Sequence, residues 1–147
     1  TTPLQAACLY AALGNQGLMY QPHIVKEINS PSEKPFVYSK IVLRKLPFSQ
    51  KTLEILKKGL EEVVQSPLGT GNLARISGIR VAGKTGTAQN PFGDDHAWFV
   101  GFAPVENPQI AVAVLVENAG HGGTVAAPMA KKIMEAYLKK EIQIAKN

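Results

Sequence analysis

Four consecutive residues combine a cation, two hydroxyl groups and a glycine in a pattern suited to binding an anion: Lys84, Thr85, Gly86 and Thr87. On an exposed strand edge, Lys84 would supply positive charge and Thr85 a hydroxyl donor for a carboxylate. Gly86 would let a substrate backbone approach closely, and the N–H of Thr87 could point at a developing oxyanion. The segment therefore predicts a carboxylate-binding strand, with an ordinary threonine-rich edge strand as the alternative.

The same segment completes a second pattern, because residues 78–85 match the phosphate-loop consensus G-x-x-x-x-G-K-[ST]. A phosphate loop must lead from a strand into a helix whose first amides hold the anion. Residues 86–93 contain Gly86, Pro91 and Gly93, which do not suit a helix start. A P-loop nucleotide hydrolase stays as an alternative function, and a helix over residues 88–100 would favour it.

Three further groups of residues could bind a ligand or a metal ion, but their patterns are weaker. Residues 69–74 match G-x-G-x-x-[GA], for which we predict a glycine-rich surface loop rather than a dinucleotide site. Asp94, Asp95 and His96 are adjacent, and because neighbouring residues on a turn rarely converge, we expect a hairpin loop and no metal site. His121 lies among glycines, where it either lines the cleft beside Lys84 or belongs to a flexible loop.

The elements that would position these residues begin with two capped helices. Thr2, Pro3 and Gln5 predict a helix start with a capping box, and Gly14 and Asn15 predict its end. Ser49 caps a second helix that runs to about residue 65, where Ser66 and Pro67 stop it. The residues between, 18–46, are predicted to form short extended pieces at the periphery.

The last third predicts strands over residues 79–87, 96–103 and 110–117, followed by a helix with Pro128 in its first turn. The connections between the strands are too short for a crossover helix, so the strands should form antiparallel hairpins. The third strand is apolar throughout, which indicates that both faces of the sheet are covered. We therefore expect an α/β sandwich, of α+β type, with an antiparallel sheet and helices on both faces.

Composition and charge are those of an ordinary soluble globular protein. The 147 residues are 45% hydrophobic and 18% charged, with a formal net charge of +5. A lysine-rich end explains part of that charge as a solvated terminal helix, so we expect no nucleic-acid partner. Its lysines are Lys131, Lys132, Lys139, Lys140 and Lys146.

Several classes of protein are excluded by simple counts. The single cysteine, Cys8, cannot form an internal disulfide and is expected to pack in a helix. The longest apolar run, residues 110–116, is far shorter than the roughly 20 residues that cross a bilayer. The sequence begins with Thr rather than Met and shows no targeting signal, from which we expect a processed chain or a piece of a longer one.

Lys84-Thr85-Gly86 is also similar to the K-T-G motif of penicillin-recognising serine transferases and β-lactamases, which accompanies S-x-x-K and S-x-N. Further stretches extend the resemblance over nearly the whole chain, most weakly between Asn29 and Leu46. Together they resemble the C-terminal half of the transpeptidase domain of class B penicillin-binding proteins, most closely the penicillin-binding protein 2 branch. These stretches are residues 2–5, 83–89, 96–104, 110–118, 121–123 and 126–128.

The resemblance implies a peptidoglycan D,D-transpeptidase, in which an active-site serine attacks the penultimate D-Ala peptide bond and β-lactams acylate the same serine. By motif position, Lys84 and Thr85 would hold the terminal carboxylate of the donor peptide or antibiotic. Gly86 would give clearance, and the Thr87 backbone N–H would form half of the oxyanion hole. The family implies stem peptides and β-lactam antibiotics as partners, no cofactor, and a location on the extracytoplasmic, periplasmic face of the cytoplasmic membrane.

One departure from the family pattern is decisive for activity. None of the six serines has Lys three residues later or Asn two residues later. We therefore expect residues 1–147 to be the C-terminal part of the domain, without the front half that carries the nucleophile, and to be inactive alone. A non-enzymatic module that binds peptide carboxylates is the other alternative. We also expect exposed apolar surface, through which the chain associates with itself or with the missing half.

Overall fold

The computed structural model of this chain describes residues 1–32 and 34–144. Its centre is a three-stranded antiparallel sheet of order β5-β6-β7, formed by β5 (Ala82–Ala88), β6 (His96–Ala103) and β7 (Ile110–Val116). The predicted strand at 96–103 is confirmed at both ends, and the third strand ends one residue earlier than predicted. The predicted antiparallel hairpins are confirmed by continuous pairing along both neighbouring strand pairs.

The predicted start of the first strand at Ile79 is wrong, because β5 begins at Ala82. Ile79 instead forms an isolated antiparallel bridge with Ile76, and its N–H donates to the Ile76 carbonyl oxygen. Arg80 accepts a hydrogen bond from the Val105 N–H at 3.0 Å. A tight turn and a contact with the β6–β7 loop therefore occupy the backbone where the sequence predicts strand.

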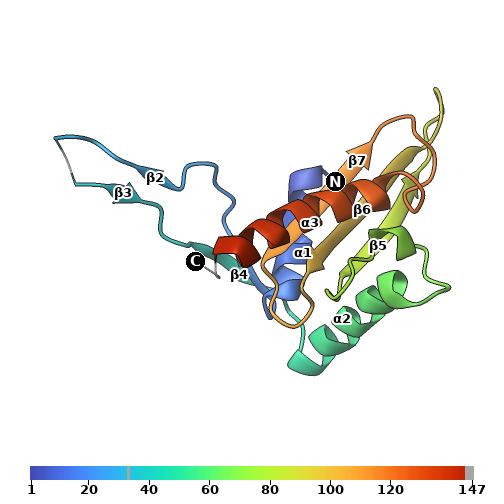
Figure 1. Cartoon of the computed structure of the whole chain (residues 1–147), viewed down its shortest axis with the longest axis horizontal. Coiled ribbons are helices and arrows are strands. Elements are labelled where there is room, and N and C mark those ends of the chain that lie inside the picture. The colour runs from blue at the N-terminus through green and yellow to red at the C-terminus, as the bar shows by residue number, and fades with distance from the viewer. Residues whose placement is uncertain (33, 145–147) are drawn as a thin grey trace.

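Helices cover both faces of the sheet, as predicted from the apolar third strand (Figure 1). On one face, Met134 and Leu138 of α3 (Ala126–Ile144) belong to the same buried cluster as Phe99. On the other, Ala12 and Leu13 of α1 (Pro3–Gly14) belong to a buried cluster with Phe102. Phe99 and Phe102 are fully buried and belong to two separate clusters, because they lie on opposite faces of β6.

Helix α1 begins where its capping residues predict. The Thr2 hydroxyl accepts a hydrogen bond from the Gln5 N–H, and the Gln5 side chain accepts one from the Thr2 N–H, which completes the predicted capping box. Helix α2 (Gln50–Gln65) is capped by the Ser49 hydroxyl, which accepts from the Thr52 N–H at 3.1 Å. It packs against β5, and it contributes Leu53 to the α1-side cluster and Val64 to the α3-side cluster.

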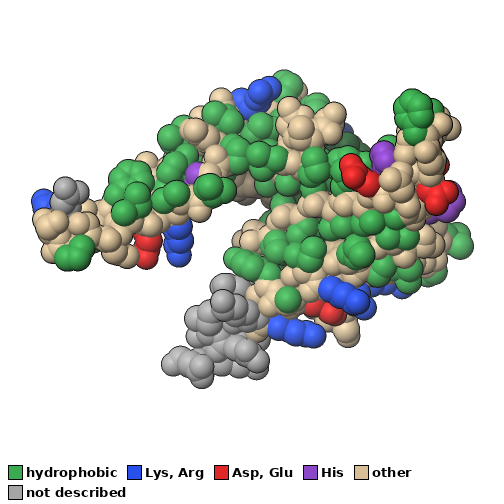
Figure 2. Space-filling model, turned by 90° about the horizontal axis from the view of Figure 1, so that it is seen from above, with side chains coloured by type: hydrophobic (Ala, Val, Ile, Leu, Met, Phe, Trp, Pro, Cys, Tyr) green, Lys and Arg blue, Asp and Glu red, His purple; other side chains and the backbone are tan. Residues whose placement is uncertain are grey.

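The residues between α1 and α2 form an arm that projects from the body (Figure 1). Its base pairs β1 (Leu18–Tyr20) with β4 (Val42–Lys45), and its tip pairs β2 (Glu27–Ile28) with β3 (Phe36–Val37). Figure 2 shows hydrophobic side chains along it. The large apolar residues of the arm that are exposed are Ile24, Val25, Ile28, Phe36, Val37, Ile41, Val42 and Leu43.

The predicted solvated face of the last helix is only partly within the described residues. Lys132 and Lys139 are exposed and Lys131 is half-buried on α3. Lys146 lies outside the described residues, as does the environment of the Lys140 side chain. Pro128 lies in the first turn of α3, as predicted.

Candidate active site

The four residues with anion-binding potential lie on β5, at the edge of the described sheet. Among the strands that the structure describes, only β6 pairs with β5. Ala82 and Gly83 are buried, whereas Lys84 and Thr87 are exposed. The strand is therefore anchored at its first residues and open to solvent where Lys84 and Thr87 lie.

Lys84 and Thr85 lie on opposite faces of the sheet. Lys84 pairs with Val100 and Thr85 pairs with Phe99, and paired residues share a face. The Lys84 ammonium group returns to the strand, because its Nζ donates a hydrogen bond to the Thr85 carbonyl oxygen at 2.8 Å. The positive charge thus lies beside the Thr85 backbone, although the two side chains start from different faces.

A second threonine, Thr70, contacts Thr85 although no motif in the sequence indicates it. The Oγ1 atoms of Thr70 and Thr85 lie 2.9 Å apart and share a hydrogen bond. Thr70 stands between Gly69 and Gly71, in the segment that we predicted as a glycine-rich surface loop. The Gly71 N–H donates to the Val63 carbonyl oxygen at 2.9 Å, and a side chain at Gly69 would collide with that carbonyl oxygen.

The predicted surface loop is confirmed at Thr70, Asn72 and Leu73, which are exposed, whereas Gly71 and Ala74 are buried and residues Asn72–Ala74 form a 3-10 turn. The sequence signal for the contact with Thr85 is the position of Thr70 between two glycines. The glycines let the backbone approach α2 closely, and this approach orients the Thr70 side chain.

The glycine-rich loop around His121 packs on the same part of β5. A Cβ atom on Gly122 would overlap the carbonyl oxygens of Gly86 and Trp98. A Cβ on Gly123 would lie 2.5 Å from the Thr70 carbonyl oxygen. The backbone of this loop thus lies directly against Thr70 and Gly86, and His121 is exposed beside it.

Asp95 and His96 take part in a separate network that ties two loops together. The Asp95 carbonyl oxygen accepts hydrogen bonds from the N–H groups of Ala119 and Gly120, at 3.0 and 2.8 Å. His96 Nδ1 accepts from the Asn118 N–H at 3.0 Å. Both residues therefore join the β5–β6 hairpin to the loop before α3.

Residues 1–32 and 34–144 contain no cluster of three or more His, Cys, Asp or Glu side chains that could hold a metal ion. The phosphate-loop alternative also lacks its structural context. After Lys84 and Thr85 the chain continues as strand to Ala88, and most of the residues that a helix would need belong to the hairpin loop and β6. The P-loop interpretation was wrong, because the segment is a strand in an antiparallel sheet.

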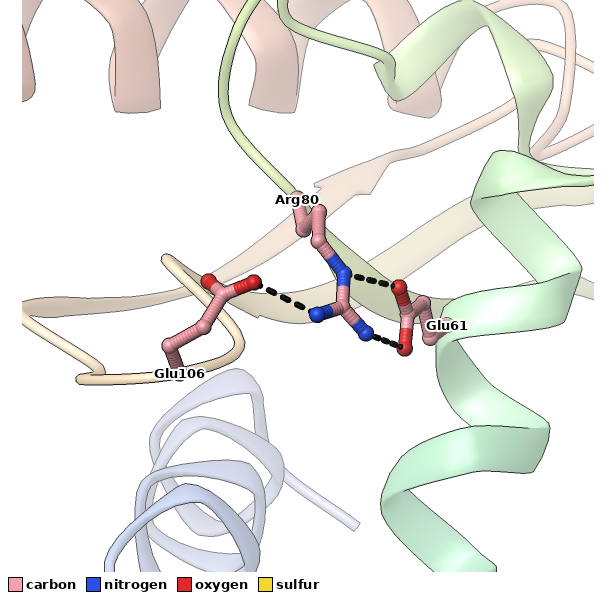
Figure 3. A network of polar contacts seen from close by, with 3 residues as sticks. All are labelled: Glu61, Arg80 and Glu106. Carbon is pink, nitrogen blue, oxygen red and sulfur yellow. Dashed lines mark hydrogen bonds and ion pairs between the residues drawn. The ribbon is translucent and has the colours of Figure 1, made fainter.

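Three charged side chains meet at the start of β5 (Figure 3). Arg80 forms a forked ion pair with Glu61 of α2, through Nε at 2.5 Å and Nη2 at 2.6 Å. Its third nitrogen, Nη1, donates to Glu106 of the β6–β7 loop at 2.7 Å. The hydrogen bonds that Arg80 donates to Glu61 raise the pKa of the guanidinium above its usual value.

A family model described as the penicillin-binding protein transpeptidase domain matches residues 1–135. The peptidoglycan D,D-transpeptidase MrdA of Haemophilus influenzae is 38% identical over 161 residues, which cover 96% of this chain and 24% of that protein. The stage V sporulation protein D of Bacillus subtilis is 38% identical over 93% of this chain and 23% of its own length. The chain thus spans about a quarter of these curated relatives.

Solved structures agree with this match. Penicillin-binding protein A of Mycobacterium tuberculosis, as an imipenem acyl-enzyme, superposes with a TM-score of 0.79 at 32% identity, over 94% of this chain and 31% of that one. PBP2 of Pseudomonas aeruginosa, in complex with WCK 5153, superposes with a TM-score of 0.75 at 38% identity, over 94% of this chain and 30% of that one. The expected resemblance and fold are both confirmed.

Proposed function

This chain belongs to the family of penicillin-binding protein transpeptidase domains, and we propose that it supplies the substrate-binding strand of a peptidoglycan D,D-transpeptidase. The single observation that carries the proposal is the exposed edge of β5. There, Lys84 and Thr87 are open to solvent, and the Thr85 hydroxyl is held by Thr70. A peptide that ends in a carboxylate can lie along such an edge as an added strand.

In the proposed reaction, Lys84 and Thr85 bind the terminal carboxylate of the donor stem peptide. A serine hydroxyl attacks the carbonyl carbon of the penultimate D-Ala, the terminal D-Ala leaves as its amine takes up a proton, and an acyl-enzyme remains. The amine of a second stem peptide then displaces the serine oxygen and forms the cross-link. The Thr87 backbone N–H donates to the oxyanion that develops on the attacked carbonyl, and Gly86 leaves room for the substrate backbone.

The nucleophile of this reaction must come from outside these 147 residues. No serine here has the S-x-x-K or S-x-N spacing, and the chain covers about a quarter to a third of its relatives. We assign residues 1–147 to the C-terminal part of a transpeptidase domain, whose activity requires a segment that carries both motifs. The chain alone is inactive in this proposal.

The proposed partners are peptidoglycan stem peptides, β-lactam antibiotics and the serine-bearing segment. Peptidoglycan lies outside the cytoplasmic membrane, so the proposed site of action is the periplasmic face of that membrane. Within the described part of the chain, no helix has the length and apolar character needed to span a membrane.

The far edge of the sheet offers a place for the serine-bearing segment. Among the described strands, only β6 pairs with β7, and β7 has seven apolar residues in succession. Unpaired backbone groups on a long apolar edge favour the addition of a further strand. The same edge would let two copies of the isolated chain associate.

A fluorescent penicillin tests the proposal directly. The isolated chain should remain unlabelled, whereas a protein in which a segment with S-x-x-K and S-x-N precedes this chain should be labelled covalently. Replacement of the serine in S-x-x-K by alanine should abolish that labelling. Covalent labelling of the isolated chain would overturn the proposed division of the site, and reversible binding of D-Ala-D-Ala peptides without any labelling in either protein would favour the non-enzymatic module.

A further inference from the structure

Helix α2 is connected to the exposed strand at two places. At the start of the strand, Glu61 holds Arg80, which stands two residues before β5. At its middle, where Thr85 contacts Thr70, the last carbonyl groups of α2 hold the segment that contains Thr70. Val63 accepts from the Gly71 N–H, and Arg75 donates to the carbonyl oxygens of Val64 and Gln65 at 2.9 and 2.6 Å.

The contact of Arg80 differs from an ordinary surface ion pair. Exposed pairs contribute little to stability, because both side chains lose freedom and water screens their charges. The Glu61 side chain, however, is only 14% exposed, and the guanidinium meets it in the forked geometry that fixes direction as well as distance. The third nitrogen of the same group reaches Glu106, so one side chain joins α2, the start of β5 and the β6–β7 loop (Figure 3).

We propose that Arg80 is a positioning residue, which through Glu61 and Glu106 fixes β5 relative to α2 and thereby sets where Lys84 and Thr85 meet a substrate carboxylate. This inference rests on the proposed function. Ala82 and Gly83, the first two residues of β5, are buried and connect Arg80 to Lys84. Because this connection is extended and packed, a shift of Arg80 would move Lys84. An edge strand that pairs on one side only depends on such contacts more than a central strand does.

The same geometry makes lysine a poor substitute for Arg80. All three guanidinium nitrogens are engaged, two of them by one carboxylate. A lysine ammonium keeps the charge but cannot form the planar fork with Glu61 while it also reaches Glu106. Arg80→Lys should therefore restore only part of the function that Arg80→Gln removes.

Amide hydrogen exchange on the chain itself is the first test. In Arg80→Gln, those amides of residues 83–87 that are hydrogen-bonded to β6 should exchange about tenfold faster, because a local contact that resists opening is lost. Amides of β7, 110–116, should be unchanged. Arg44→Gln, which removes an exposed arginine of β4, is the matched control and should change neither set. Glu106→Gln should accelerate the same amides of β5 by a smaller factor. If Arg80→Gln accelerated exchange equally in β5 and β7, or in neither, the positioning role would be overturned.

Carboxylate recognition is the second test, in a full transpeptidase domain that contains this chain. Acylation rates by benzylpenicillin and by its methyl ester are compared, since only the acid offers a carboxylate. The wild type should prefer the acid by about ten- to a hundredfold, as expected for a charged hydrogen bond. Arg80→Gln should reduce that ratio several-fold and Arg80→Lys should restore it in part.

A loss of folded protein would lower both rates equally and leave the ratio unchanged, so the ratio separates positioning from stability. If the wild type is not acylated or shows no preference for the acid, the proposed function fails. If the wild type shows the preference and Arg80→Gln keeps it in full, the positioning role of Arg80 fails alone.

Discussion

The Thr70 hydroxyl lies 2.9 Å from the Thr85 hydroxyl, so the loop that follows α2 touches the strand that carries Lys84. The contact spans 15 positions of sequence. It sets the direction of the Thr85 hydroxyl, which can act as a donor or as an acceptor. If the Thr70 oxygen accepts, the Thr85 proton is engaged there, and if Thr70 donates, the Thr85 proton is free for a substrate carboxylate.

Replacing Thr70 by valine tests this contact. Thr70→Val keeps the shape of the side chain and removes its hydroxyl, so Thr85 loses one partner. In a full transpeptidase domain that contains this chain, acylation by benzylpenicillin should slow by about two- to tenfold, which corresponds to one net hydrogen bond. Thr70→Ser retains the oxygen and should stay close to the wild type. Equal rates for the valine and serine variants would show that the hydroxyl has no such role.

Lys84 should matter through its charge. Lys84→Gln leaves a polar side chain of similar length but removes the cation that we propose binds the carboxylate. The acylation rate of the same domain should fall by about ten- to a hundredfold, the range for a hydrogen bond to a charged group. Lys58→Gln, on the exposed surface of α2, removes the same charge elsewhere and serves as the control. A similar loss in both variants would point to long-range electrostatics instead of a direct contact.

The close approach of Gly122 to β5 predicts a loss of stability on substitution. A methyl group at Gly122 would overlap the carbonyl oxygens of Trp98 and Gly86, whereas a methyl group at Gly59 on α2 would meet no atom within 4 Å. Gly122→Ala should lower the free energy of unfolding by about 1–3 kcal/mol, as expected for overpacking. Gly59→Ala should raise it by about 0.5–1 kcal/mol, because alanine favours the helix. Urea unfolding measures both, and a neutral Gly122→Ala would contradict the tight packing of this loop.

The sequence predicts the fold correctly where residues close together in the chain determine the structure. The capping residues Thr2 and Ser49 place the starts of α1 and α2, and the apolar run of β7 predicts helices on both faces of the sheet. The K-T-G pattern led to the exposed strand edge because its residue types are unusual together. These features depend on neighbours within a few positions of sequence.

Contacts between distant segments account for what the sequence did not reveal. Ile79 and Arg80 have strand-like neighbours, but Arg80 is engaged by Glu61, 19 positions away, and by Glu106, 26 positions away. No residue near Thr70 in sequence identifies Thr85 as its contact. The carboxylate-binding pattern places Lys84 and Thr85 on one edge, whereas alternation along β5 directs their side chains to opposite faces of the sheet.

The unpaired edge of β7 leads to a prediction about association. Leu115 pairs with Trp98 on the α1 side of the sheet, is only half-buried, and lies four residues beyond Ala111, which packs in the α1-side cluster. In the isolated chain, this apolar edge should pair with a second copy, so the mass measured by sedimentation should rise with protein concentration. Leu115→Lys places a charge on the edge strand and should shift the chain towards monomer.

Ile55→Lys is the matched control, because Ile55 is an apolar residue of α2 with 63% of its surface exposed. It should leave the association unchanged, since α2 lies beside β5, at the opposite edge of the sheet from β7. If Phe36→Lys on the arm, but not Leu115→Lys, abolished association, the arm would be the contact surface. A wild-type chain that stays monomeric at high concentration would contradict edge pairing altogether. The serine-bearing segment should compete with self-association, because both would use the same backbone groups of β7.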